Sequence, residues 1–280
     1  MPDPYATIAD ADSALQERLS EILELRAKDS QQQAMLRAYL SEVELPPGAK
    51  ALEIGCGTGA VSRALVEWLK LEVTGLDPSP IFVARAQELG AALPGLTFMV
   101  GDGCSLPFAD ASFDLVVFHT TLCHIPNPEV ALCEAYRVLR PDGWLTVFDG
   151  DFTTTTVAIN AFDPLQHLVN AMVANFVHDP WLVRRLSKTL ESTGFRLLSL
   201  RSHGYTQTAE PTYMLTLVDR GADILSASGS LSADAADALR KEARRRAQAG
   251  EFFGHISFVS VIARKPNYLT PNKSLEQTRD

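Results

Sequence analysis

The chain has 280 residues, of which 46% are hydrophobic and 21% charged, and its 34 acidic and 25 basic residues give a net charge of −9. This length predicts one large globular domain, with or without a cap. The acidic balance argues against a broad nucleic-acid-binding surface. No uncharged apolar stretch is long enough to suggest a membrane span. The first 20 residues lack the basic and then apolar pattern of a secretory signal, so we expect a cytoplasmic protein.

Metal binding is not expected from the cysteines. Cys56, Cys104, Cys123 and Cys133 form no C-x-x-C pair and have no zinc-like partners at suitable spacing. We expect four free thiols and no metal site. The basic run Arg240–Arg246 falls on one arc of a predicted helix, which is more typical of a solvated face than of an RNA-binding patch.

Helical periodicity occupies the first part of the chain. Apolar residues recur at helical spacing in residues 12–28 and 31–40, and Pro46, Pro47 and Gly48 then break the pattern. We therefore expect residues 1–45 to form an N-terminal helical lid that precedes the first strand.

Short apolar strands then alternate with helices. The strands are predicted at 51–54, 72–76, 96–100, 115–118 and 144–148, and the helices between them at 61–69, 81–89 and 128–139. This alternation is typical of a parallel sheet with helices on both faces, an α/β fold.

The alternation of strands and helices becomes less regular after the fifth strand. An amphipathic helix is predicted at 181–193, and two final strands at 195–203 and 256–264. The roughly 50 residues between those strands are too many for a plain loop, and Ser232 and Gly250 suggest the ends of a helix there. We expect a Rossmann-like, mostly parallel seven-stranded domain over 46–204 and 255–266. A helical substrate cap is expected over 205–254, before the last strand, and a flexible tail over 267–280.

A glycine-rich loop follows the first strand, in Glu53-Ile54-Gly55-Cys56-Gly57-Thr58-Gly59. Glycines at a strand–helix turn allow a ligand to approach the backbone, and the helix start offers unpaired N–H groups. The loop also fits the dinucleotide pattern, so an NAD(P)-dependent oxidoreductase is the first alternative. Glu53 argues against it, because a carboxylate there would repel a pyrophosphate and suits a cationic amino acid.

Two further acidic residues follow the next strands. Asp77 lies 18 residues after Gly59 at a strand end, where a carboxylate commonly accepts hydrogen bonds from ribose hydroxyls. Asp102, in Val100-Gly101-Asp102-Gly103, is placed to accept from an adenine amino group.

These motifs together resemble the class I S-adenosylmethionine-dependent methyltransferases, in their small-molecule branch (methyltransferase type 11, UbiE-like). Phe113-Asp114-Leu115-Val116 and the segment Arg137–Gly143 also match that family's motifs. The resemblance is close over residues 49–150 and loose over 179–203. It implies S-adenosyl-L-methionine as cofactor, S-adenosyl-L-homocysteine as product, and a small-molecule substrate.

The resemblance assigns roles to individual residues. Glu53, Gly55, Cys56 and Gly57 would lie near the methionine end of the cofactor. The other cofactor-binding residues that it implies are Asp77 and Pro78 at the ribose and adenine, Asp102 and Gly103 at the adenine, His119 through its backbone, and Arg26 from the lid at the methionine carboxylate.

A catalytic base is expected at the carboxyl ends of strands four and five, where ligands collect in open α/β sheets. His124 follows strand four, and a histidine can accept a proton near neutral pH. Asp149 and Asp151, at the end of strand five, would orient it or help to deprotonate the substrate. The alternative is that His124 only packs against the following helix.

The sequence therefore predicts methyl transfer to a small molecule, in small-molecule or natural-product biosynthesis, with oxygen slightly favoured over nitrogen or carbon as acceptor. A second alternative is a binding module that kept the cofactor fold and lost catalysis. The methyl acceptor and the oligomeric state are left open.

Overall fold

A single seven-stranded sheet organises the protein in a computed structural model that describes residues 3–267. The strands follow the order β3-β2-β1-β4-β5-β7-β6, and all neighbours are parallel except β7, which runs antiparallel to both β5 and β6. The expected Rossmann-like fold is thus confirmed. The strands are β1 (Lys50–Ile54), β2 (Glu72–Asp77), β3 (Leu96–Val100), β4 (Phe113–His119), β5 (Leu139–Thr156), β6 (Arg196–Gln207) and β7 (Gly254–Arg264).

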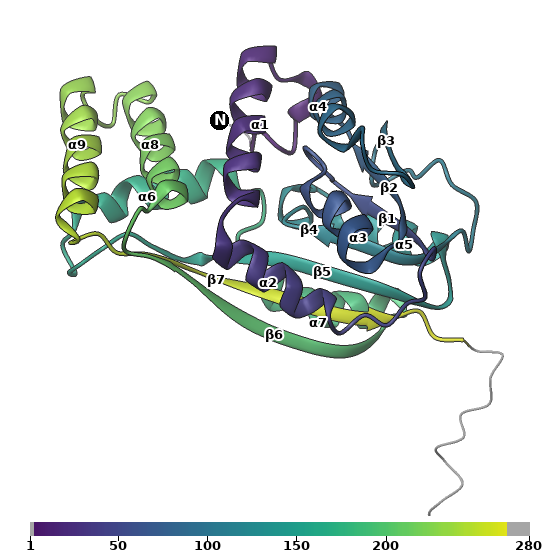
Figure 1. The fold of residues 1–280 in the computed structure, drawn as a ribbon. Helices are drawn as coiled ribbons and strands as arrows, with labels where there is room; N and C mark the ends of the chain where they lie inside the picture. The colour runs from purple at the N-terminus through teal and green to yellow at the C-terminus, as the bar shows by residue number, and fades with distance from the viewer. Residues whose placement is uncertain (1–2, 268–280) are drawn as a thin grey trace, which may run out of the picture.

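Helices cover both faces of the sheet (Figure 1). Between the strands lie α3 (Ala60–Leu69), α4 (Pro80–Gly90), α5 (Pro128–Val138) and α7 (Leu182–Thr193). The central strands β1, β4 and the middle of β5 are buried on both faces, and β4 accordingly carries a continuous apolar run, Leu115–Phe118. None of the helices within residues 3–267 is long and apolar enough to cross a membrane.

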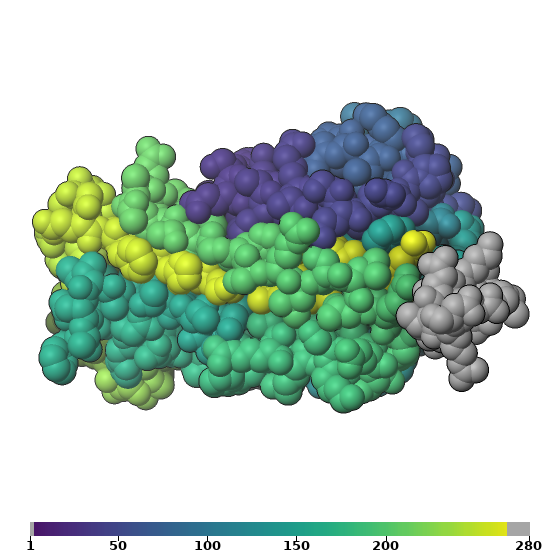
Figure 2. Space-filling model, turned by 90° about the horizontal axis from the view of Figure 1, so that it is seen from below, coloured from purple at the N-terminus to yellow at the C-terminus, as the bar shows by residue number. Residues whose placement is uncertain are grey.

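The N-terminal helices are part of the packed structure. After η1 (Ile8–Asp10), α1 (Ser13–Ala27) stands beside α4, and α2 (Ser30–Leu40) lies along β6 and β7 (Figure 1). The fully buried ring of Tyr39 stacks on Phe148 of β5 at 5.4 Å between centroids. Figure 2 shows these helices against β6, where the Tyr205 hydroxyl donates to Asp29 at 2.9 Å.

Two segments differ from the expected elements. The helix α5 passes directly into β5 at Leu139, so Pro141–Gly143 lies within the strand rather than in a separating turn. The threonine run 153–156 extends the same strand, which makes β5 18 residues long. The hydrogen bonds of β5 to β7 explain this length, because they continue to the pair Thr156–His255. Most of the expected tail, residues 268–280, lies outside the described residues.

The cap is built from two parts of the chain. Its helices are α8 (Thr212–Ala227) and α9 (Ala233–Ala249), which fall in the expected 205–254 segment, and also α6 (Pro164–Phe176), which precedes α7. These three helices pack together at the far ends of the long strands β5, β6 and β7 (Figure 1). Helix α6 belongs to this group because it packs mainly against α8, and its apolar face, including Leu168 and Met172, is buried.

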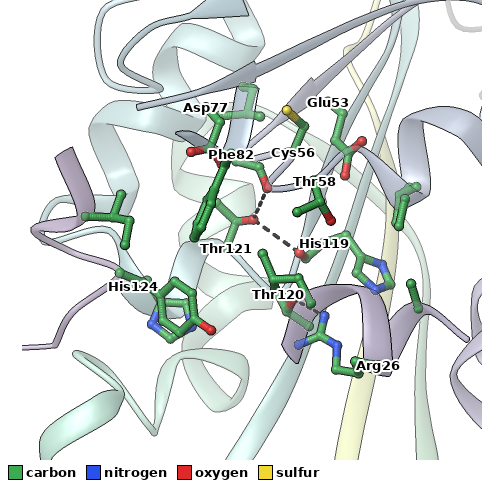
Figure 3. A pocket seen from close by; sticks show the side chains of 18 of the residues that line it. Arg26, Glu53, Cys56, Thr58, Asp77, Phe82, His119, Thr120, Thr121 and His124 are labelled. Carbon is green, nitrogen blue, oxygen red and sulfur yellow. Dashed lines mark hydrogen bonds between the residues drawn. The ribbon is translucent and has the colours of Figure 1, made fainter. Parts of the chain in front are cut away.

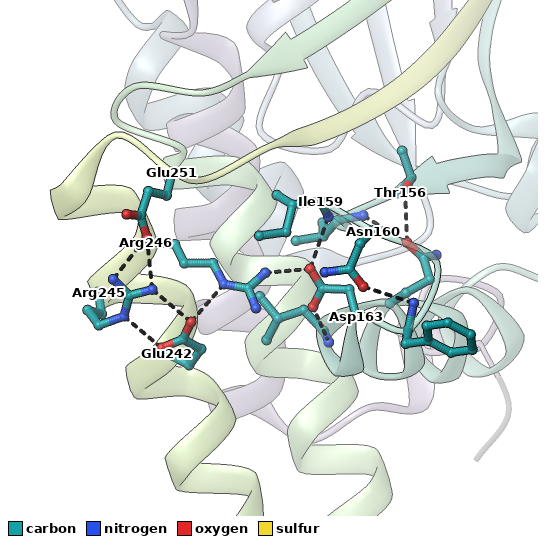
Figure 4. Close-up of polar contacts among 12 residues, drawn as sticks. Thr156, Ile159, Asn160, Asp163, Glu242, Arg245, Arg246 and Glu251 are labelled. Atoms are coloured by element: carbon teal, nitrogen blue, oxygen red, sulfur yellow. Dashed lines mark hydrogen bonds and ion pairs between the residues drawn. The ribbon is translucent and has the colours of Figure 1, made fainter.

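A buried ion pair joins the two parts of the cap (Figure 4). Arg246 of α9 donates to Asp163 at 2.5 Å, and the two side chains are 10% and 0% exposed. Asp163 also accepts from the backbone N–H groups of Ile159 and Leu165, so it caps α6 at the same time. Arg246 reaches Glu242 on its own helix at 2.8 Å. The pair therefore fixes α9 against the start of α6.

We predict that Arg246→Met destabilises the cap, because it leaves the buried Asp163 carboxylate without its countercharge. Removing one partner of such a pair costs about 3–5 kcal/mol. Urea unfolding should show this loss, and hydrogen exchange should show it concentrated in α6 and α9. The matched control is Arg245→Met, since Arg245 pairs with Glu242 and Glu251 on the surface, where solvent screens the pairs, and its loss should change the stability little. Equal effects of the two substitutions would contradict the assignment.

Candidate functional site

One cavity of about 860 Å³ lies over the carboxyl ends of β1, β2 and β4. Its floor is the glycine loop and the segments that follow β2, β3 and β4. Residues from η1, α1 and α2 cover it, and α6 and α8 of the cap close its other end. In parallel α/β sheets this edge is where ligands bind. The cavity is large enough for a small-molecule ligand, by the usual range of about 300–1,000 Å³.

The glycine loop folds tightly because its backbone is bonded to the end of β2. The N–H groups of Gly55 and Cys56 both donate to the carbonyl of Leu76, at 2.8 and 3.0 Å. Gly55 has a φ of +71°, and a Cβ added there would lie 2.2 Å from the Thr121 side chain. No larger residue fits this turn without displacing the segment after β4.

Asp77 holds the loop from the side. It is 5% exposed, and its carboxylate accepts from the N–H groups of Gly57 at 2.8 Å and Ser79 at 2.9 Å. Burial raises the pKa of Asp77 to about 6, against the lowering effect of these two bonds. The side chain that caps α4 is Ser79, which accepts from the N–H of Phe82. Asp77 is thus free of a helix-capping role and faces the cavity.

Glu53 is the second buried carboxyl group of the floor. It is 2% exposed and accepts a hydrogen bond from the Ser62 hydroxyl. Burial raises the pKa of Glu53 to about 8, although the bond from Ser62 acts in the opposite direction. The carboxyl group is therefore mostly protonated at neutral pH in the structure, and a cation beside it would favour its ionised form.

Helix α1 is tied down onto the glycine loop. Glu24 accepts from the Thr58 hydroxyl at 2.6 Å and pairs with Arg63 of α3 at 3.0 Å. Leu23 packs over Gly57, where an added Cβ would lie 2.9 Å from its methyl group. These contacts make α1 one wall of the cavity.

Arg26 continues this wall toward the end of β4 (Figure 3). Its guanidinium donates to the Thr120 hydroxyl at 2.5 Å, and Thr120 has a φ of +53°, which is uncommon for a residue with a branched side chain. Thr121 next to it donates to the carbonyls of Gly55 and His119, so the turn joins the glycine loop to β4 (Figure 3).

His119 is a neutral histidine in the cavity wall. Its Nδ1 lies 2.9 Å from the Tyr39 hydroxyl, and its ring stacks on Phe148 at 4.7 Å. Burial, together with the positive charge of Arg26, holds the pKa of His119 well below its ordinary value.

His124 is oriented by the N-terminal segment. Its Nδ1 lies 2.7 Å from the Asp3 carboxylate, and its ring centroid is 4.7 Å from that of Tyr5. Asp3 also accepts from the N–H groups of Tyr5 and His178, so both of its oxygens are engaged. The His124 side chain lines the cavity, and the position of its ring is fixed by the bond between Nδ1 and Asp3.

Asp149 and Asp151 have other partners than the His124 ring nitrogen. Asp149 is fully buried and accepts from the N–H groups of Cys123 and Gly150, and Asp151 pairs with Arg184 at 2.9 Å. Neither lines the cavity, and the carboxylate bonded to His124 is that of Asp3. The Asp149 side chain bonds to the backbone after β4 and in β5, and the Asp151 side chain pairs with α7, which the sequence pattern does not reveal.

The structure brings most of the residues expected at the site to one cavity. Those that line it are Arg26, Glu53, Gly55, Cys56, Asp77, Pro78, Asp102, Gly103, His119 and His124. Gly57 lies just behind the lining, with its N–H bonded to Asp77. The sequence reasoning missed Asp3, Thr58, Thr120 and Arg220. Within residues 3–267, no group of His, Cys, Asp and Glu side chains could hold a metal ion, and all four cysteines are free.

Comparison with known proteins finds a similarity in the part of the chain that carries this cavity floor. Residues 52–147 match the family model described as a methyltransferase domain. This match begins in β1 and ends in β5, so it includes the glycine loop, Asp77, Asp102 and His124.

Two curated relatives are similar over part of the chain. A 2-methyl-6-phytyl-1,4-hydroquinone methyltransferase of Synechocystis sp. is 41% identical over 105 residues, which are 38% of this chain and 33% of the relative. A demethylmenaquinone methyltransferase of Staphylococcus epidermidis is 33% identical over 135 residues, 48% of this chain and 54% of the relative. The matches thus span between a third and about half of these relatives' lengths.

A solved structure has a similar fold over most of this chain. The phosphoethanolamine N-methyltransferase 2 of Haemonchus contortus, in complex with phosphomonomethylethanolamine and S-adenosylhomocysteine, superposes with a TM-score of 0.54. The superposition covers 84% of this chain and 53% of that chain at 20% identity. At this identity the likeness concerns the fold.

We predict that Glu53 makes the stability of the ligand-free protein fall as the pH rises. Its folded pKa of about 8 lies above the ordinary value of 4.5 for glutamate, so the folded state keeps a proton that the unfolded chain releases. The contribution of Glu53 to the free energy of unfolding is complete below pH ~4.5. It is lost as the pH rises to ~8, which changes that free energy by about 3–5 kcal/mol.

Glu53→Gln should remove this contribution, so the variant becomes more stable than the parent as the pH rises from 5 to 8.5. Urea unfolding across that range measures the difference, and Glu44→Gln at an exposed position serves as control. A constant difference between parent and Glu53→Gln would show that Glu53 ionises normally.

Proposed function

We propose that the protein transfers a methyl group from S-adenosyl-L-methionine to a small-molecule acceptor, because residues 52–147 match the methyltransferase-domain model. The observation that carries this proposal is the meeting of the glycine loop, Glu53, Asp77 and Asp102 in one cavity. The same cavity continues under the cap, where it leaves room for an acceptor next to the cofactor. S-adenosyl-L-homocysteine is then the product.

The cavity floor fits such a cofactor. Asp77 would accept from the ribose hydroxyls, with Pro78 beside it, and Asp102 with Gly103 would hold the adenine, since all four line the cavity. The buried Glu53 suits the ammonium and sulfonium charges, because a cation nearby stabilises the ionised carboxyl group. Arg26 and the turn at Thr120 would receive the methionine carboxylate. When bound, the cofactor supplies an electrophilic methyl group on a cationic sulfur.

His124 is the proposed general base. It lies in the cavity after β4, on the side of the cap, and Asp3 holds its ring in place through Nδ1. The opposite ring nitrogen is then available to accept a proton from an acceptor hydroxyl as the methyl group moves. This arrangement favours oxygen as the methylated atom. The curated relatives, which are named for a hydroquinone and a demethylmenaquinone, support a small ring-bearing acceptor.

Cofactor binding is tested by calorimetry. We expect S-adenosylhomocysteine to bind and NADH not to bind. Asp77→Asn should weaken the binding about 10–150-fold, since hydrogen bonds to a charged acceptor are worth roughly 1.5–3 kcal/mol. Asp110→Asn, at an exposed carboxylate outside the cavity, is the matched control. Binding of NADH in place of the thioether would support an oxidoreductase, and no binding of either would reject the proposal.

The role of His124 is tested by methyl transfer from labelled S-adenosylmethionine to a panel of hydroquinones and catechols. His124→Gln should lower turnover about 10²–10⁴-fold while the affinity for S-adenosylhomocysteine stays within about threefold. Asp3→Asn should have a smaller effect in the same direction, because it acts on the His124 ring through its orientation and leaves the ring nitrogens in place. His167→Gln on α6, which is exposed and outside the cavity, should change nothing. Full turnover of the His124 variant would make that residue a packing residue.

A further inference from the structure

Arg220 is a cation in the cavity wall without an acidic partner. It lies on α8, and its Nη2 is buried and makes no hydrogen bond. The guanidinium carbon lies 5.1 Å from the centroid of the Phe176 ring, which covers one side of the group. A buried donor that is left unbonded costs free energy, and more so when it is charged.

The neighbouring arginines of the cap are all paired. Arg240 and Arg244 bond to Asp219 and Asp223 on the outer side of α8, and Arg246 bonds to Asp163. Arg220 follows Asp219 directly in sequence, yet it forms no ion pair with any of the residues that the structure describes. Among the cap arginines, the one that lines the cavity is therefore the one without an acidic partner in the described residues.

The surroundings of Arg220 are apolar and lack acidic groups. Tyr213, Leu217 and Arg220 face the cavity from one side of α8, and Met172, Phe176 and Val177 face it from α6 and the residue that follows it. Burial raises the pKa of Tyr213, and the positive charges of Arg26 and Arg220 act against this rise, so both guanidinium groups lie near the phenol.

The acidic residues of the cavity wall are at its other end or are already bonded. Glu53, Asp77 and Asp102 belong to the floor, and Glu24 is paired with Arg63. Glu67, the remaining acidic residue of the lining, lies on α3 rather than in the cap. The cavity therefore has an acidic end at the glycine loop and a cationic, apolar end at the cap.

We propose that Arg220 binds a carboxylate of the acceptor, and that the acceptor is an amphipathic molecule with an apolar body against Phe176, Met172 and Leu217. The planar guanidinium fork matches a carboxylate with two parallel hydrogen bonds. Such a group supplies the partner that Nη2 lacks, and the apolar wall excludes water from the pair, which strengthens it. This inference rests on the proposed function, because it assigns the cap end of the cavity to the methyl acceptor.

Binding of matched acids and amides tests the assignment. The probes are benzoate, 4-phenylbutanoate and decanoate, each beside its amide, which has nearly the same shape and no charge. Calorimetry with and without saturating S-adenosylhomocysteine should show at least one acid binding more tightly than its amide. Arg220→Met, which keeps an apolar stem, should weaken that acid about 10-fold to 100-fold and leave the amide unchanged.

Two further variants complete the test. Arg220→Lys should restore part of the affinity, because a lysine supplies the charge without the fork. Arg196→Met, at an exposed position of β6, removes the same charge outside the cavity and should have no effect. The affinity of Arg220→Met for S-adenosylhomocysteine should match that of the parent, which shows that the variant is folded.

Two results overturn the assignment. In one, no acid binds more tightly than its amide; in the other, an acid binds the parent and Arg220→Met equally. Failure of S-adenosylhomocysteine to bind the parent is a different result. It rejects the methyltransferase proposal and leaves the acid–amide comparison at Arg220 intact.

Discussion

The turn from β1 into α3 depends on one buried carboxylate, that of Asp77. Its bond to the Gly57 N–H, with the bonds of Gly55 and Cys56 to Leu76, shapes the loop on which the cavity floor is built. Thr121 packs against Gly55 where no side chain would fit, so the segment after β4 takes its position from the same loop. Arg26 then bonds to Thr120, and α1 is placed by contacts that also begin at the loop. A change at Asp77 would therefore reach the cavity floor and part of its cover.

The charges of the cavity are separated along its length. Two buried carboxyl groups with raised pKa values, Glu53 and Asp77, lie at the glycine loop, and the unpaired Arg220 lies under the cap. Both ends are unfavourable in the empty protein, because the two carboxyl groups and the Nη2 atom of Arg220 are buried without a countercharge. A cationic ligand at one end and an anionic ligand at the other would relieve both costs. Such complementarity provides a physical reason for the two halves of the cavity to bind different molecules.

The sequence predicted the parts of the site that depend on local spacing. Strand alternation, the glycine loop and the strand-end carboxylates Asp77 and Asp102 follow from residues close together in the chain, and the structure places them in one cavity. The partner of His124 could not be predicted, because Asp3 reaches it across 121 positions of sequence. Asp149 was the expected partner because it ends the neighbouring strand, but its oxygens bond to the backbone of Cys123 and Gly150. Arg220 was missed for a related reason, since an unpaired arginine is visible only once all possible partners have been placed.

Because the cavity is formed by two parts of the chain, similarity to relatives in one part gives little information about the acceptor bound by the other. The match to the methyltransferase domain ends at residue 147, before Phe152 of β5 and before the cap residues in the cavity wall, from Met172 to Arg220. The cap joins to that domain through the long strands β5, β6 and β7, and it is stabilised internally by the Asp163–Arg246 pair. Side chains on α6 and α8 can therefore differ between relatives without disturbing the glycine loop. The chemistry of the acceptor is accordingly better inferred from Phe176, Leu217 and Arg220 in this chain than from the substrates for which its relatives are named.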